Sequence, residues 1–360
     1  MLRSKFLPII VFIIAIISVQ VLTGLTDKAQ YLTQLTMTGY YSLVIIGLCM
    51  LIGYAGQISL GHAGFFAIGG YVSAFLTTYN LAPHKEKPLI SVLAKAGLLG
   101  SVQDLYGGNT IVLNPWLACI AAVAVTVLIA YIIGGPILKL KGHYLAMATL
   151  GFGTIVYKVV LATSFFGAAD GLSDIPGFRV LPGLEVSGKP GLRVQNYYIA
   201  WGLVALGMLL LTNLIHSRVG RALRSIHSAE DAANAMGINT GRYKLNIFVL
   251  SAVFAALGGV FLTHYNGGIG PSEASIMKSV RYVAIVAIGG MANLWGALAM
   301  GFVLNFLSLR GYFGSYDDAI FGVILILIML FAPEGLLRRA VFQGLKKQLS
   351  GKKPAGGQQA

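Results

Sequence analysis

Residues 29–83 read AQYLTQLTMTGYYSLVIIGLCMLIGYAGQISLGHAGFFAIGGYVSAFLTTYNLAP and contain no Asp, Glu, Lys or Arg. A helix needs about 20 apolar residues to cross a bilayer, so an uncharged run of this length is too long for one helix. The chain must therefore turn back within it. The turn signal is GYAGQISLGHAG at 53–64, which holds four glycines and separates two expected spans at 35–52 and 65–82. This stretch indicates a membrane protein that crosses the bilayer repeatedly.

The composition of the 360-residue chain agrees with lipid as its main solvent. Charged residues make up 11% of the chain, whereas soluble domains carry about 25%. The formal net charge of +14 comes from basic residues in short segments between apolar runs, which argues against nucleic acid as a partner. Cys49 and Cys119 lie inside apolar runs, so we expect neither a disulfide nor a metal site. Residues 6–26 are uncharged and no A-x-A-type cleavage site follows, which favours a retained first span.

Further apolar runs extend this pattern. They lie at about 115–137, 144–166, 196–215, 245–265, 282–309 and 319–333. The run 282–309 is broken by GGMANLWG at 289–296, and it gives nine crossings if it is one helix or ten if it is two. Basic residues near both termini place both ends in the cytoplasm, which requires an even number. We therefore predict an all-α polytopic fold with about ten transmembrane helices and two glycine-rich interruptions. Segment 282–290 is either a full crossing or a re-entrant half-helix.

The ten-span arrangement distributes charge as expected for a bacterial protein. Its cytoplasmic side receives 15 basic residues and three acids. Of the other 11 basic residues, Lys158 lies inside a span and ten lie on the opposite side with nine acids. An excess of Lys and Arg on the cytoplasmic side follows the positive-inside rule. We expect a multi-pass protein of the bacterial inner (plasma) membrane, in contact with membrane lipid.

The two glycine-rich interruptions have two readings. Irregular backbone at membrane depth survives only where protein or a water-filled cavity satisfies it, and paired broken segments are typical of transport pathways. The alternative is an ordinary helix–turn–helix connection at the cytoplasmic surface. The candidate pathway-lining residues are Gln57, Ser59, His62, Lys158 and Asn293. Their plainer alternatives are turn formation for the amides and the hydroxyl, packing for the histidine, and a lysine side chain that reaches the outer membrane surface.

The loop 216–244 reads HSRVGRALRSIHSAEDAANAMGINTGRYK. Its first part is basic, with apolar residues at helical spacing. We expect Ser228 to cap a second, shorter helix, with Asp231 three residues later in a near capping box. Alanines follow, and Gly237 ends the helix as a C′ glycine does. Such a short helix, lying parallel to the membrane in the cytoplasm, has small side chains suited to a groove on another protein.

The segment Asp231–Gly237, DAANAMG, resembles the E-A-A-x-x-x-G loop of ATP-binding-cassette (ABC) importer permeases, with Asp in place of Glu. In that family the loop is the coupling helix that docks onto the ATP-binding subunit. Its position between the sixth and seventh expected spans is similar to that in importers with ten-helix permeases. The resemblance implies a coupling loop made of Ser228, Ala229, Glu230, Asp231, Ala232, Ala233, Asn234, Ala235, Met236, Gly237 and Ile238.

Longer stretches resemble the branched-chain amino-acid ABC permeases, in particular the longer of the two permease subunits. They are LKLKGHYLAMATLGFGTIV (138–156), ADGLSDIPG (169–177), VGRALRSIHSAEDAANAMGINTGRYKLNIFVLSAVFAALGGVF (219–261) and FAPEGLLR (331–338). The resemblance implies a small amino-acid substrate and, as partners, ATP-binding cassette subunits, a second homologous permease and a periplasmic substrate-binding protein. The chain has no G-x-x-x-x-G-K-[ST] motif, so a partner subunit would use the ATP and no cofactor is expected here.

The expected organisation is a transmembrane permease domain at 1–338, which includes the coupling loop, and a basic, disordered cytoplasmic tail at 339–360. No Ser/His/Asp set, carboxylate pair or metal cluster stands at catalytic spacing, so we do not expect an enzyme. Two other functions stay open: a urea or short-amide ABC importer, and an ion-coupled secondary transporter. The second needs a buried cluster of acids or bases at mid-membrane, and the expected spans contain only Lys158.

Overall fold

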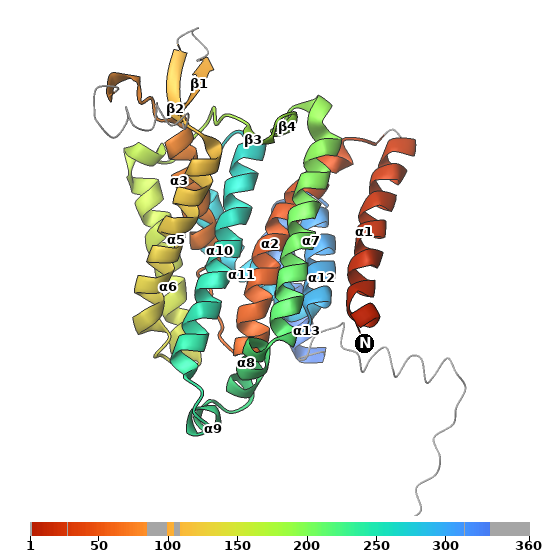
Figure 1. Ribbon diagram of the computed structural model, residues 1–360, viewed down its shortest axis with the longest axis vertical. Helices are drawn as coiled ribbons and strands as arrows, with labels where there is room; N and C mark the ends of the chain where they lie inside the picture. The colour runs from red at the N-terminus through yellow and green to blue at the C-terminus, as the bar shows by residue number, and fades with distance from the viewer. Residues whose placement is uncertain (1, 27, 85–98, 104–108, 313, 332–360) are drawn as a thin grey trace, which may run out of the picture.

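The computed structural model describes residues 2–26, 28–84, 99–103, 109–312 and 314–331. Twelve α-helices lie within these ranges. The ten that form the bundle are α1 (Leu2–Leu25), α2 (Tyr31–Ala55), α3 (His62–Thr78), α5 (Pro115–Ile137), α6 (His143–Ala162), α7 (Arg193–His216), α10 (Thr240–Asn266), α11 (Ile276–Gly289), α12 (Leu294–Leu309) and α13 (Asp317–Phe331). The two shorter ones, α8 (Arg218–Ser228) and α9 (Glu230–Ala235), lie at one end of the bundle (Figure 1). The predicted tail at 339–360 lies outside the described residues.

The helices agree with a membrane protein. By length and composition, six of those described can cross a bilayer: α1, α2, α5, α6, α7 and α10. The helices α3, α11, α12 and α13 are shorter, with 14 to 17 residues each. Ten helices thus run along the bundle, while ten complete crossings stay a prediction.

The centre of the bundle is α2. In the apolar part of α2, 94% of the residues are buried, whereas in that of α1 the share is 11%. It packs against α7, α10 and α12. Next to it, the backbones of α3 and α10 are in close contact at Gly259, where any side chain would overlap the main chain of Phe66. In lipid, close van der Waals packing of this kind, rather than hydrophobic burial, holds helices together.

The outer helices α5 and α6 turn large apolar side chains away from the bundle. Ile120 and Leu128 on α5, and Met147 and Ile155 on α6, are each at least 60% exposed. Soluble proteins rarely expose contiguous apolar patches of this kind. These faces therefore suit contact with lipid.

Two β-hairpins depart from the all-α expectation. β1 (Leu99–Gln103) pairs antiparallel with β2 (Asn109–Leu113), and β3 (Phe178–Leu181) pairs antiparallel with β4 (Leu184–Val186). Both hairpins lie at the end of the bundle opposite α9 (Figure 1). The sequence predicts only polar loops here, because strands of three to five residues are too short to show a clear alternation of apolar and polar positions.

Helix α11 begins at Ile276, earlier than the expected start at 282. Ser275 precedes it, and its side-chain oxygen accepts a hydrogen bond from the backbone N–H of Lys278 at 3.3 Å, as an N-cap does. The expected span excluded charged residues and therefore began after Arg281. The structure instead places Lys278 and Arg281 in the first two turns of the helix.

Candidate functional site

Helix α8 packs its apolar side against one end of the bundle. Ser217 caps it, since the side-chain oxygen accepts hydrogen bonds from the backbone N–H groups of Val219 and Gly220 at 3.1 and 3.4 Å. Leu223 and Ile226 are buried, and the helix packs against α2 and α7. Its arginines at 218, 221 and 224 are exposed. The helix expected from the apolar spacing in the first part of the loop is present.

Helix α9 follows after one extended residue. Ala229 (φ −157°, ψ 96°) separates the two helices and provides no side-chain cap. The expected cap, Ser228, is instead the last residue of α8 and donates its hydroxyl to the carbonyl of Ser225 at 3.0 Å. The predicted capping box is therefore wrong, although Glu230 and Asp231 do occupy the first turn. The acids in that turn interact favourably with the helix dipole without capping the helix.

Gly237 ends α9 as expected. Its φ of +82° is a left-handed conformation that glycine adopts without steric cost. Its N–H donates to the carbonyl of Asn234 at 2.9 Å, and the N–H of Ile238 donates to that of Ala233 at 3.1 Å. This double closure is a helix C-terminal motif that turns the chain toward α10.

One side of α9 is fastened to the start of α10. Ala233 is 3% exposed, and the carboxylate of Glu230 forms an ion pair with Lys244, whose side chain is 9% exposed. Thr240 donates its hydroxyl to the side-chain oxygen of Asn234 at 3.0 Å. Because the lysine is shielded from water, its pairing with Glu230 ties the orientation of α9 to that of α10.

The opposite side of α9 faces outward. The side chain of Asp231 is 92% exposed and Met236 is 84% exposed, and Ala232 and Ala235 are exposed beside them. Asp231 also lies 3.6 Å from the ammonium of Lys141, in the turn between α5 and α6. Helix α9 of the coupling loop thus has one side bound to α10 and an opposite side that is exposed and carries mostly small side chains.

The two glycine-rich interruptions meet at this same end of the bundle. The hydroxyl of Tyr54 donates to the carbonyl of Ala292 at 2.9 Å, and the thiol of Cys49 lies 3.5 Å from the carbonyl of Met291. A side chain on Gly53 would overlap the main chain at Met291. Segments about 240 positions apart in the sequence therefore form one contact, next to α8.

Three of the five candidate pathway residues are buried, and two of them, Ser59 and His62, are in contact. His62 is fully buried, with Ser59 Oγ 3.0 Å from its Nδ1 and Ser251 Oγ 2.7 Å from its Nε2. Gln57 is 2% exposed, and its side-chain oxygen and nitrogen have no hydrogen-bond partner among the described residues. A buried amide without a partner is costly, which suits a position beside a polar ligand or water. A pathway role for these three residues stays a prediction.

The other two candidates lie apart from this group. Asn293 directly precedes α12, in the segment that contacts the end of α2. Lys158 is exposed on α6, with its ammonium 6.0 Å from the ring centre of Tyr157. This position suits the expected alternative of a lysine that reaches the membrane surface.

Residues 30–332 match the family model of the branched-chain amino acid transport system permease component. The chain belongs to this family. The permease is 31% identical to the high-affinity branched-chain amino acid transport system permease protein LivM of Salmonella typhimurium, over 84% of this chain and 68% of that protein. It is 26% identical to LivH of Escherichia coli, over 86% and 95%, and 27% identical to BraD of Pseudomonas aeruginosa, over 86% and 95%. No solved structure matches the permease.

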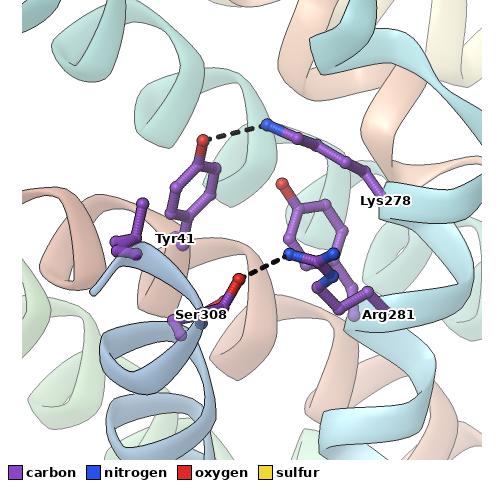
Figure 2. Close-up of a pocket in the computed structure, with 7 residues that line it drawn as sticks. Tyr41, Lys278, Arg281 and Ser308 are labelled. Atoms are coloured by element: carbon purple, nitrogen blue, oxygen red, sulfur yellow. Dashed lines mark hydrogen bonds between the residues drawn. The ribbon is translucent and has the colours of Figure 1, made fainter. Parts of the chain in front are cut away.

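A second polar site of the permease, which the sequence does not predict, lies at the end opposite α9. A cavity of about 70 Å³ lies there between α2, α11 and α12 (Figure 2). Its polar lining residues are Tyr41, Lys278, Arg281, Tyr282, Asn305 and Ser308. The expected spans contain only Lys158, but α11 starts earlier than expected and also contains Lys278 and Arg281. The available signal was Ser275, which can cap a helix that includes both cations.

Proposed function

We propose that the permease is the membrane-spanning subunit of an ABC importer that carries branched-chain amino acids across the inner membrane. Its family supports this proposal, as do relatives that are named for high-affinity transport of these substrates. Separate ATP-binding subunits hydrolyse ATP. A second, homologous permease and a periplasmic substrate-binding protein complete the importer.

The observation that carries the coupling role is the two-sided environment of α9. Its inner side is fastened to α10 through Glu230 and Lys244, and its outer side exposes Asp231 and Met236. A helix that receives force from a partner needs both properties: a free surface for the partner and a stiff connection to the bundle. When the ATP-binding subunits close and reopen, α9 moves with them and tilts α10.

The proposed topology has ten crossings, with both termini in the cytoplasm. Two features support it. The N-terminus lies at the same end of the bundle as α8 and α9 (Figure 1). At the other end, α13 starts beside α12, where Asp317 accepts a hydrogen bond from Ser308, so that α13 runs back toward the α9 end.

Co-purification of the ATP-binding subunit tests the coupling surface. Met236→Glu adds a charge to the smooth outer side of α9 and should reduce the amount of ATP-binding subunit recovered with the permease about tenfold or more, which corresponds to about 1.4 kcal/mol or more. Met277→Glu is the matched control, because Met277 is also exposed but lies at the start of α11, at the opposite end. Full recovery with Met236→Glu, from a permease that stays folded, would refute α9 as the docking surface.

A further inference from the structure

The cavity between α2, α11 and α12 carries both signs of charge at its edge. Lys278 forms an ion pair with Glu273. A guanidinium nitrogen of Arg281 lies 2.8 Å from a carboxylate oxygen of Asp317 and 2.8 Å from one of Asp318. Figure 2 shows the two cations on the same side of the cavity, facing Tyr41 and Ser308. Two cations therefore line one small space, and three acids pair with them next to it.

Several groups around this cavity lack a partner. Arg281 Nε, Tyr282 Oη, Asn305 Nδ2 and Asp317 Oδ1 make no hydrogen bond within the described part of the chain. Tyr282 is 1% exposed and Asn305 is 4% exposed. Buried polar groups are normally paired, and each one left unpaired carries a penalty. Three of these groups belong to residues that line the cavity, and Asp317 pairs with one of them, Arg281. Together they point to a ligand.

The unpaired groups have a defined chemistry. The nitrogens of Arg281 and Asn305 only donate hydrogen bonds, the Tyr282 hydroxyl can donate or accept, and the Asp317 oxygen only accepts. Donors that include a guanidinium match a carboxylate. An anionic acceptor matches an ammonium. The combination is complementary to a molecule that carries both groups on one carbon.

We propose that this cavity binds the zwitterionic headgroup of the amino acid during its passage. The carboxylate accepts hydrogen bonds from Arg281, Asn305 and the hydroxyl of Tyr282, and the ammonium donates to Asp317. A zwitterion brings no net charge to the cluster, so the existing ion pairs can stay in place. The inference rests on the proposed import function and adds a substrate site within the permease.

The size of the cavity limits what it can hold. A water molecule takes about 30 Å³ of liquid volume, and the cavity measures about 70 Å³. The amino and carboxyl groups with their shared carbon fit such a space, but the aliphatic side chain does not. The site therefore recognises the part that all α-amino acids share, and the choice among side chains must be made elsewhere in the importer.

Two substitutions separate a ligand site from a packing role. Tyr282→Phe and Asn305→Leu remove groups that have no partner in the permease, so they should leave its melting temperature equal or higher. Each removes a hydrogen bond to a charged ligand group and should weaken binding about tenfold or more. Val303→Leu is the matched control on α12, because Val303 is 43% exposed and does not line the cavity.

The measurement is equilibrium binding of tritiated L-leucine to the purified, nucleotide-free importer without its substrate-binding protein. We expect saturable binding by the wild type and by Val303→Leu, and about tenfold or more weaker binding by Tyr282→Phe and Asn305→Leu. Isoamylamine and 4-methylpentanoate each carry only one of the two charges. Both should displace leucine at least about tenfold less well than unlabelled leucine does.

Three results would overturn the site. They are wild-type affinity in both cavity variants, equal displacement by a singly charged analogue, and weaker binding that comes with a lower melting temperature. Absence of leucine binding to an importer that takes up leucine into ATP-loaded vesicles also overturns it, while the import function stands. If the complete importer takes up no leucine in those vesicles, the proposed function fails instead.

Discussion

The two ends of the permease each contain a shielded lysine–glutamate pair, yet the surroundings of the pairs differ. At the α9 end, Lys244 and Glu230 are 9% and 26% exposed, and beyond them lies the free outer side of a short helix. At the opposite end, Lys278 and Glu273 are 24% and 17% exposed, and beside them lie a cavity and unpaired polar groups. The same chemistry fastens a docking helix at one end and borders a cavity at the other.

A shielded ion pair therefore does not by itself identify a function. Removing one partner of such a pair is costly wherever it lies, because the other charge is left shielded and unpaired. What separates the two ends is which atoms stay free once the pair has formed. At the α9 end these atoms are exposed, and at the other end they lie around a small cavity.

The largest effect is expected from the contact that joins the two interruptions at the α9 end. Gly53→Val would drive a side chain into the main chain at Met291, and overpacking against backbone costs on the order of 3 kcal/mol. The yield of monodisperse permease in mild detergent should fall strongly. Gly135→Val is the matched control, since no atom lies within 4 Å of the added carbon. Equal yields from the two variants would show that this end is not rigid.

The next effect compares the two ion pairs directly. Lys244→Met should release α9 from α10, expose residues 229–239 to limited proteolysis, and lower ATP-driven uptake about tenfold, equivalent to about 1.4 kcal/mol. Lys278→Met should leave the proteolysis of that segment and the recovery of the ATP-binding subunit as in the wild type. The double variant Glu230→Gln/Lys244→Met should regain part of the protection, because no unpaired charge remains. Equal cleavage of the 229–239 segment in both single variants would remove the distinction between the ends.

The smallest effect concerns a single hydrogen bond. Tyr54→Phe removes the bond from the Tyr54 hydroxyl to the carbonyl of Ala292 and should cost about 1 kcal/mol, seen as a melting temperature lower by about 2 °C. Tyr144→Phe is the control, because Tyr144 is 73% exposed on α6. A loss as large as that of Gly53→Val would mean that the hydroxyl, and not close backbone packing, holds the two segments together.

The sequence predicts the helices well where charge is absent. Long uncharged runs such as 29–83 force a turn, and the glycines at 53–64 locate it between α2 and α3. The end of α9 at Gly237 follows equally well from local chemistry, because few other residues adopt its backbone conformation readily. These features depend on neighbours in the chain and are therefore visible without the fold.

The sequence fails where the outcome depends on distant contacts. Nothing near Gly53 reveals that Met291 will lie against it. The predicted start of α11 is wrong because the charges of Lys278 and Arg281 indicate a polar stretch, whereas Arg281 pairs with the distant Asp317 and Lys278 with Glu273 just before the helix. Ser228 has the composition of a cap, but the preceding helix continues through it.

Helix α10 joins both ends, and its length has a mechanical consequence. Its 27 residues span about 40 Å at a rise of about 1.5 Å per residue. It starts with Thr240 and Lys244, which bind α9, and after its last turn the chain continues through Gly267 to Glu273. Such a helix acts as a lever: a tilt of about 5° at the clamped end would displace the far end by roughly 3.5 Å, given that length. A displacement of that size exceeds a hydrogen-bond length, so one small rotation is enough to move Glu273 away from Lys278 at the edge of the cavity.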